Sequence, residues 1–224
     1  MLTLFAAGTA AAHEEIPEYE VFGGYDLLKL GASNNDIRHY QDELYATEIT
    51  WNNNNTSFFL KRGGGGSVAF NLNEYLSIAA DARYNQGNLV KGSLEYEYVA
   101  PIFDVSFQVN EPFVIGLKNV SAMAGPRVSL RKERTTAFFH ALAGLDYWRL
   151  NINYSVAGEK WSSTAHKFGP GVDIGGGVDV SVNKKIAVRV IQADYYPTRQ
   201  LKRWMNNVNL SFGIVFRIGE KVLK

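Results

Sequence analysis

The sequence contains no cysteine, which excludes disulfide bonds, cysteine-ligated metal sites and thiol catalysis. A chain without cysteine is compatible with an oxidising compartment but does not require one. No run of about 18 apolar residues is present either, so no transmembrane helix is predicted although 46% of the residues are hydrophobic. The formal net charge of only +1 argues against nucleic acid as a main partner.

Motifs that would point to bound groups are also missing. There is no HExxH motif, no carboxylate cluster at metal-ligand spacing and no phosphate-binding loop. Glycine runs occur at residues 63–66 and 175–177, but neither is followed by the helix that a dinucleotide-binding site needs. We therefore expect neither a metal ion nor a cofactor.

What the sequence does contain is a regular alternation in its last apolar segment, residues 208–218. A period of two predicts a β-strand with one apolar face and one polar face. The large apolar residues of one parity are Val208, Leu210, Phe212, Ile214, Phe216 and Ile218. The opposite parity holds Asn209, Ser211, Gly213 and Arg217, with Val215 as the apolar exception.

The same alternation recurs along the chain, with large apolar residues on one face and Gly, Ser, Asp or Arg on the other. The expected strands cover residues 19–29, 57–71, 75–85, 119–131, 136–148, 168–181, 185–196 and 208–218. A soluble barrel buries its apolar face, whereas a membrane barrel turns that face to lipid and its polar face to the lumen. The pattern therefore predicts an all-β fold, an antiparallel up-and-down transmembrane β-barrel of about eight strands.

The expected connections alternate between long and short, apart from a modest last loop at residues 198–204. The long ones cover residues 30–56, 86–118 and 150–166, and the short ones cover 71–74, 132–135 and 182–184. Outer-membrane barrels combine long extracellular loops with short periplasmic turns. Strand-like pieces inside residues 86–118 are interpreted as a hairpin that extends beyond the membrane. The alternative is a fifth membrane hairpin, which would make ten strands.

Two segments are irregular. The Gly63–Gly66 run would weaken a soluble strand, but in a narrow barrel it leaves room for large lumen side chains opposite. A flexible glycine loop is the alternative. The seventh strand loses its alternation near Gln192, which indicates a β-bulge.

The polar faces carry charges of both signs. Lumen positions are predicted for Glu20, Asp26, Asp81, Asp146, Asp173, Asp179, Lys61, Arg83, Arg127, Arg131, Arg189 and Arg217. The interior of an eight-stranded barrel is just wide enough for side chains, and unpaired buried charges are costly. We therefore predict a lumen salt-bridge cluster of Asp81, Arg83, Arg127, Asp173 and Arg189. In it Asp81 reaches Arg127, and Asp173 reaches Arg189. A gated narrow pore is the alternative to a structural plug.

Aromatic residues gather near the ends of the expected strands. They are Tyr19, Phe70, Tyr84, Tyr147, Trp148, Tyr195, Tyr196 and Trp204. Interfacial belts of a membrane protein explain this distribution, since amphipathic rings sit at the level of the lipid headgroups.

Five runs, at residues 21–25, 124–127, 175–180, 192–195 and 210–217, resemble a known family. It is the small outer-membrane β-barrel family related to the OmpA transmembrane domain and OmpX, and the resemblance covers about residues 19–218. The last strand is similar to the family's C-terminal assembly signal, carried here by Val208, Leu210, Phe212, Ile214 and Phe216. This implies the outer-membrane assembly machinery as a partner. Two departures are the residues 219–224 that follow the signal and the enlarged segment 86–118.

The N-terminus resembles the end of a secretory signal. A short apolar stretch precedes Ala10–Ala12, and polar residues begin at His13. We expect residues 1–12 to be a signal-peptide remnant and residues 13–224 to form one outer-membrane β-barrel domain. A frayed, alanine-rich terminus is the alternative.

The histidines are candidate catalytic groups, because some small outer-membrane barrels modify lipids with a nucleophilic Ser beside a His. His140 is followed by Ala141 and Leu142, with no serine beside it, and Ser163 and His166 have no recognisable spacing. We therefore expect no enzyme activity.

The resemblance implies a monomer in the outer membrane of a Gram-negative-type bacterium, surrounded by membrane lipid and lipopolysaccharide, with its long loops extracellular. The expected function is structural or surface-interactive, with at most a narrow, largely plugged pore. An OmpW-like channel for small or apolar solutes is the first alternative. A lipid-modifying enzyme and a soluble lipocalin-like barrel follow it.

Overall fold

The computed structural model describes residues 15–31, 50–56, 58–100, 105–156, 159–200 and 203–222. Its strands are β1 (Glu15–Ile16), β2 (Tyr19–Lys29), β3 (Thr50–Thr56), β4 (Phe59–Asn71), β5 (Leu76–Ala100), β6 (Val105–Lys132), β7 (Thr135–Val156), β8 (Glu159–Ser181), β9 (Ile186–Gln200), β10 (Arg203–Ile218) and β11 (Lys221–Val222). Among these residues no helix is long and apolar enough to cross a membrane. The predicted signal remnant at residues 1–12 and most of the predicted loop 30–56 lie outside the described residues.

Eight strands form a closed antiparallel ring in the order β2, β4, β5, β6, β7, β8, β9 and β10. Strand β10 pairs back with β2 from Val208↔Lys29 to Ile218↔Tyr19, which closes the ring. The predicted up-and-down barrel of eight strands is therefore confirmed. The ten-strand alternative is wrong, because residues 86–118 continue β5 and β6 as one hairpin paired as far as Ala100↔Val105.

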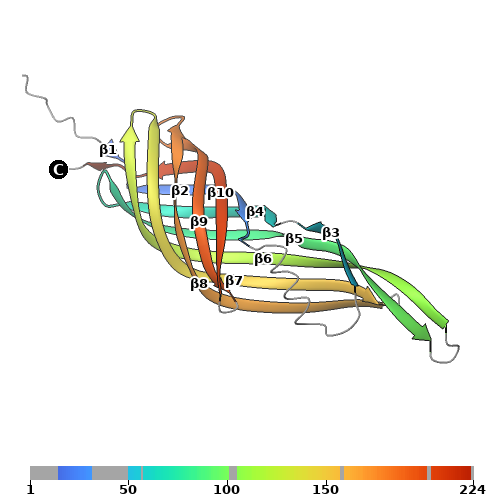
Figure 1. Ribbon diagram of the computed structural model, residues 1–224. Helices are drawn as coiled ribbons and strands as arrows, with labels where there is room; N and C mark the ends of the chain where they lie inside the picture. The colour runs from blue at the N-terminus through green and yellow to red at the C-terminus, as the bar shows by residue number, and fades with distance from the viewer. Residues whose placement is uncertain are drawn as a thin grey trace, which may run out of the picture.

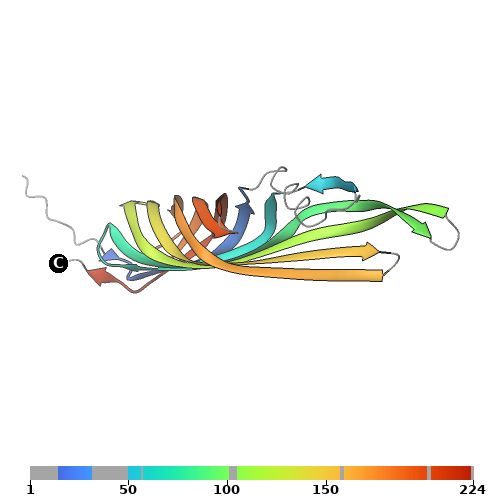
Figure 2. The same cartoon turned by 60° about the horizontal axis from the view of Figure 1, so that its bottom comes forward.

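The hairpins β5–β6 and β7–β8 project well beyond one end of the ring (Figures 1 and 2). The predicted loop 150–166 is also mostly strand, since β7 continues to Val156 and β8 begins at Glu159. Strand β3 adds to the projecting part of β5, with Thr50 opposite Glu95. The short turns and the paired strands β1 and β11 lie at the opposite end (Figure 1). We call the end with the short turns proximal and the end with the long hairpins distal.

The apolar face of β10 points outward, as the alternation predicts. Leu210, Phe212 and Ile214 are 37%, 54% and 47% exposed, whereas Asn209 and Ser211, of the opposite parity, are buried. The inward Val215 packs against Phe22 and Ala187. The barrel is thus turned inside out relative to a soluble one, with its apolar surface outside.

A β-bulge interrupts β9, as predicted near Gln192. Val190 and Ile191 are both exposed, and the register shifts here against both neighbouring strands. The shift turns Gln192 and Asp194 inward, and both are buried. A second irregularity lies between β2 and β4, beside Lys61. It leaves Lys61 exposed, so the predicted lumen position of Lys61 is wrong.

The glycine run lies within β4, paired with β2 and β5. A Cβ atom on Gly63 would collide with the amide oxygen of Asn85, and one on Gly65 with the carboxylate of Asp26. The run therefore makes room for lumen side chains, and the flexible-loop alternative is wrong.

Candidate functional site

The inward charges at the proximal end gather around Glu20, at the start of β2. The carboxylate of Glu20 lies 2.9 Å from Arg127, 3.2 Å from Arg131 and 3.8 Å from Arg217. Arg217 also donates a hydrogen bond to Ser181 at 2.7 Å. These cations converge from β6 and β10 on one acid that is only 1% exposed.

A second acid, Asp179, joins this proximal network. Arg189 donates to both carboxylate oxygens of Asp179, at 2.8 Å and 3.1 Å, and Arg127 lies 3.7 Å from the same group. Both arginines also make cation–π contacts with Phe138. The Cζ atom of Arg127 lies 4.1 Å from the centroid of the ring, and that of Arg189 lies 4.3 Å from it. The aromatic face stabilises two cations that would otherwise repel each other.

Farther along the strands, Arg83 is the centre of a distal network. Its guanidinium lies 2.8 Å from Asp81, 2.7 Å from Asp173 and 2.9 Å from Asp194. The Nε2 atom of His140 lies 3.4 Å from both Asp173 and Asp194. The planar fork of an arginine suits this use, because it can reach several carboxylates at once.

The two networks are linked by Gln192. Its side-chain oxygen accepts a hydrogen bond from Arg189 at 2.7 Å, and its amide nitrogen donates to Asp194 at 2.7 Å. This residue faces the lumen only because of the bulge in β9. A continuous polar network therefore fills the lumen from Glu20 to Arg83.

An apolar layer follows at the distal end of the ring. The buried side chains of Leu28, Leu60, Leu117, Trp148 and Tyr196 belong to one cluster. Asp146 lies beneath this layer and accepts hydrogen bonds from Asn119 and Tyr196, both at 2.5 Å, and from Trp148. Trp148 and Tyr196 thus face the lumen, so their predicted place in an outer aromatic belt is wrong.

All five residues of the predicted salt-bridge cluster are buried in the lumen, but their partners differ from those expected. Asp81 pairs with Arg83 rather than Arg127, because Asp81 lies opposite Met123 in the β5–β6 register. Asp173 also pairs with Arg83. Arg189 lies opposite Asp179 in the β8–β9 register and takes that acid instead.

His140, Asp173 and Asp194 place ligand atoms within 4.8 Å of one another, close enough for a metal ion. The same two carboxylates are already ion-paired with Arg83. The arrangement therefore fits an ion-pair network better than a cation site.

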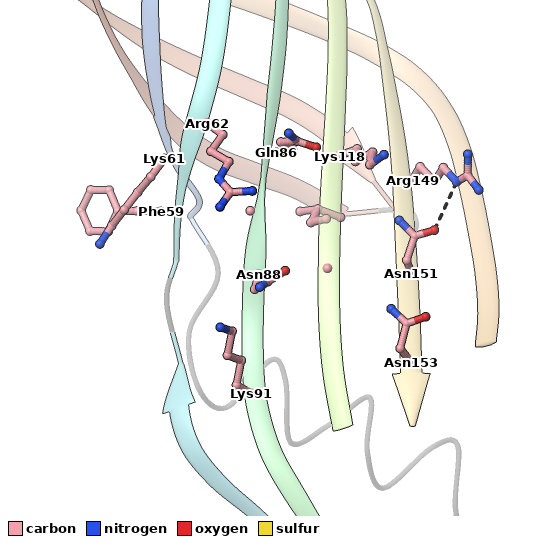
Figure 3. A pocket seen from close by; sticks show the side chains of 13 residues that line it. Phe59, Lys61, Arg62, Gln86, Asn88, Lys91, Lys118, Arg149, Asn151 and Asn153 are labelled. Atoms are coloured by element: carbon pink, nitrogen blue, oxygen red, sulfur yellow. Dashed lines mark hydrogen bonds between the residues drawn. The ribbon is translucent and has the colours of Figure 1, made fainter. Parts of the chain in front are cut away.

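A different polar site lies on the outer face of the wall, where β4, β5, β6 and β7 leave the ring. It is a pocket of about 560 Å³ with cations on three of its sides (Figure 3). We call the five cations that line it the cationic shelf: Lys61, Arg62, Lys91, Lys118 and Arg149. Amide side chains fill the spaces between them, namely Gln86, Asn88, Asn151 and Asn153.

Alternation decides which face carries this pocket. In β6, Leu117 and Asn119 are buried inside, so Lys118 between them points outward. In β7, the inward Trp148 is likewise followed by the exposed Arg149. The shelf is therefore a feature of the outer surface and has no part in the lumen. The sequence carries no sign of the shelf, because its residues come from four strands with no common motif.

Several solved structures are similar to this chain. Ail, the attachment invasion locus protein of Yersinia pestis, solved in complex with the heparin analogue sucrose octasulfate, is 12% identical, with a TM-score of 0.50 over 91% of this chain and 99% of that one. Neisserial surface protein A is 14% identical, with a TM-score of 0.45 over 90% of this chain and 97% of that one. The N-terminal barrel domain of OprF from Pseudomonas aeruginosa is 11% identical, with a TM-score of 0.36 over 91% and 98%.

No curated protein matches the sequence. The family model for the outer membrane protein beta-barrel domain matches residues 1–217, nearly the whole chain. The likeness to Ail agrees with this match at the level of the fold. Together with the closed ring and its outward apolar face, the match shows that the chain belongs to the outer membrane protein β-barrel family.

Proposed function

We propose that this chain is a non-conducting outer-membrane barrel that presents its projecting hairpins β5–β6 and β7–β8 as an interaction surface. The distal end lies outside the cell and the proximal end in the periplasm, as the distribution of long and short connections favours. The barrel acts as a monomer and performs no catalysis of its own. Its role is to anchor and orient the exposed hairpins.

The observation that carries this proposal is the filling of the lumen. Arg83, Arg127 and Asp194, from three different strands, are 5%, 3% and 1% exposed. In an eight-stranded ring the interior holds little more than its own side chains. Here it holds paired charges linked by Gln192 and covered by an apolar layer. Opening a water path would require breaking buried ion pairs, which is strongly unfavourable.

The projecting hairpins favour an interaction role. In β8 the segment from Glu159 to Phe168 pairs with β7 on one side. The pairing of β8 with β9 on the other side begins only after this segment, at Gly171. Among the described residues this segment has no strand on its other side, so it presents a backbone edge that another chain can pair with. Surface segments held by a rigid scaffold commonly carry function. Ail, named for attachment and invasion, is a relative in fold that makes attachment a reasonable class of interaction to test.

We further propose that the outward alternation of β10, from Val208 to Phe216, is the signal that the outer-membrane assembly machinery reads. All five residues of this signal are exposed on one face of the strand. The residues after it turn back under the barrel, since Lys221 of β11 pairs with Ile16 of β1. Assembly of a chain truncated after Ile218 would test whether these following residues are needed.

Planar lipid bilayers test the closed lumen. Purified protein should give no steady single-channel conductance at moderate voltage, while a general porin recorded in the same bilayers supplies the positive control. Steady, reproducible channels from the purified protein would contradict the plug and favour the alternative, a channel for small or apolar solutes.

A further inference from the structure

The cationic shelf begins where the outward apolar band of the barrel ends. Tyr84, Val120, Tyr147 and Phe168 are cross-strand neighbours on β5 to β8, and all four belong to the outward face. Phe168 is 68% exposed and packs against Tyr147 with ring centroids 4.6 Å apart. Exposed aromatic rows of this kind lie at the membrane interface of a barrel. We call these four residues the interface row.

Two residues farther toward the distal end, the outward row changes from apolar to polar. Gln86, Lys118, Arg149 and His166 are the cross-strand neighbours there, and Arg62 of β4 pairs with Gln86. The two rows are connected by Tyr84, whose hydroxyl donates to the Gln86 side chain at 2.9 Å. A lipid molecule with its acyl chains on the interface row would place its headgroup on the shelf.

The shelf is strongly one-sided in charge. Five cations line the pocket, and none of its thirteen lining residues is an aspartate or a glutamate. Cations gathered without acids raise the local concentration of anions. The Nε atom of Arg149 donates to the Asn151 side chain at 3.2 Å, which holds the guanidinium in place beside Lys118 (Figure 3). Arginine and lysine bind phosphate well, and fixed guanidinium groups bind it best.

The amides around the cations extend the site in the same direction. Asn88, Asn151 and Asn153 lie farther toward the distal end than Lys118 and Arg149, and Thr164 donates to Asn151 at 3.2 Å. Amides both donate and accept hydrogen bonds, so they suit sugar hydroxyls. Along the outer wall the apolar row is therefore followed by the cations Arg62, Lys118 and Arg149 and then by the amides, an order that matches acyl chains, phosphates and sugars. Lys91 lies at the level of the amides, because Lys91 and Asn153 both lie opposite Val114.

The geometry points to a binding site on the cationic shelf for the phosphorylated glycolipid of the outer leaflet, that is, for the phosphates of lipopolysaccharide. The inference rests on the proposed orientation, with the distal end outside. A soluble polyanion offers the same charges but makes no use of the interface row beneath the shelf. The glycolipid is therefore the partner that the whole surface fits.

The test measures binding of lipid A to the full-length protein in detergent micelles. One variant combines Arg62→Gln, Lys118→Gln and Arg149→Gln. A control variant removes the same charge from exposed residues of the proximal turns with Arg134→Gln, Lys184→Gln and Lys185→Gln. The probes are lipid A with two phosphates, the same lipid with both phosphates removed, and a soluble sulfated oligosaccharide. A shift of electrophoretic mobility on heating shows that each variant is folded.

We expect the shelf variant to bind phosphorylated lipid A at least about tenfold more weakly than the wild type, since it loses three charge-assisted contacts. The control should stay within about twofold, and dephosphorylated lipid should bind the wild type as weakly as phosphorylated lipid binds the shelf variant. Exchanging charges conservatively, with Lys118→Arg and Arg149→Lys, should preserve binding.

Equal binding by the shelf variant and the wild type would overturn the inference, and so would equal binding of the two lipids. If the sulfated oligosaccharide bound as tightly as lipid A, the inferred ligand would be a soluble polyanion and not a lipid, and the inference would be overturned. If only the control variant lost binding, the lipid site would lie at the proximal end. That result would contradict the proposed orientation of the barrel, with the distal end outside the cell. None of these results depends on the lumen, so a conducting barrel would leave the inference standing.

Discussion

Arg83 shows how a single side chain can determine the charge balance of a barrel interior. It contacts Asp81, Asp173 and Asp194, all of them buried. Removing Arg83 would leave these carboxylates buried without a cation. An unpaired buried carboxylate carries a large desolvation penalty, so the loss of Arg83 would destabilise the fold.

Replacing this cation should destabilise the barrel strongly. We expect Arg83→Met to lower the free energy of unfolding by about 3–5 kcal/mol, because three carboxylates lose their shared partner. The measurement is reversible urea unfolding in lipid vesicles or detergent. Arg62→Met makes the same chemical change on the outer surface and should cost less than about 0.5 kcal/mol. Equal stability of the two variants would show that the distal network contributes nothing.

The outward face of β10 gives a second prediction at this scale. Ile214→Arg places a charge near the middle of the outward apolar row of β10, which runs from Val208 to Ile218, and should cost about 2–4 kcal/mol. Ile218→Arg, at the proximal end of the same face, should cost only about 0–1 kcal/mol. Unfolding from lipid vesicles measures both. A larger cost at Ile218 than at Ile214 would contradict this placement of the apolar band.

Alternation alone predicted which way most side chains point, but their partners depend on register. The inward position of Asp194 could not be read from parity, since the bulge at Val190 and Ile191 reverses it. The adjacent Val190 and Ile191 are the only visible signal. The adjacent Phe138 and Phe139 fit either parity, but alternation with Ala141, Ala143 and Leu145 predicts Phe139 outward, and the structure confirms this with Phe138 buried. Its place between Arg127 and Arg189 needed the structure.

At the scale of elements, the β5–β6 hairpin continues far beyond the ring that it helps to form. Its pairing partners outside the ring are chiefly its own two strands, β3 and part of β7. We therefore expect the projecting half of the β5–β6 hairpin to contribute little to the stability of the ring.

Shortening this hairpin should separate anchoring from interaction. Residues 90–115 would be replaced by Asn-Gly, so that Leu89 and the inserted pair form a three-residue hairpin loop between the paired Asn88 and Gly116. We expect the shortened protein to keep its heat-dependent mobility shift while losing adhesion or ligand binding conferred by the wild type on cells. A matched chain with Asn-Gly inserted at the β8–β9 turn should keep both. Failure of the shortened chain to fold would mean that the ring needs the projection.

The sequence signal for these elements weakened where the membrane ends. Residues 150–154 still alternate, with Leu150, Ile152 and Tyr154 on one face, but residues 159–166 are largely polar on both faces, which is typical of a loop, although they are paired strand. A strand outside lipid has no need of an apolar face, so the alternation that marks membrane strands fades toward the distal end although the hydrogen bonds continue. The turns, by contrast, were placed well because asparagines such as Asn73 and Asn183 accept the backbone hydrogen bonds of tight reversals.

At the scale of the whole molecule, the eight-stranded ring and its inverted faces followed from repeated alternation and from the spacing of turns. For the lumen networks, the sequence predicts the sign and number of the inward charges. It does not predict which acid pairs with which cation. The cationic shelf was not predicted at all. Its residues come from four strands and become neighbours only once the cross-strand register is fixed.

The pairing of β1 with β11 brings Glu15 and Val222 side by side beneath the ring. Lys221 also joins β11 to the turn after β4 by donating to the backbone oxygen of Leu72 at 3.0 Å. A short linker from Val222 back to Glu15 would therefore close residues 15–222 into a circle, and new ends could be opened at a proximal turn such as residues 182–185. Such a circular permutant would be synthesised in a different strand order and close at a different seam. We expect it to form the same barrel, because the fold is defined by which strands pair around the ring and not by the strand that is synthesised first.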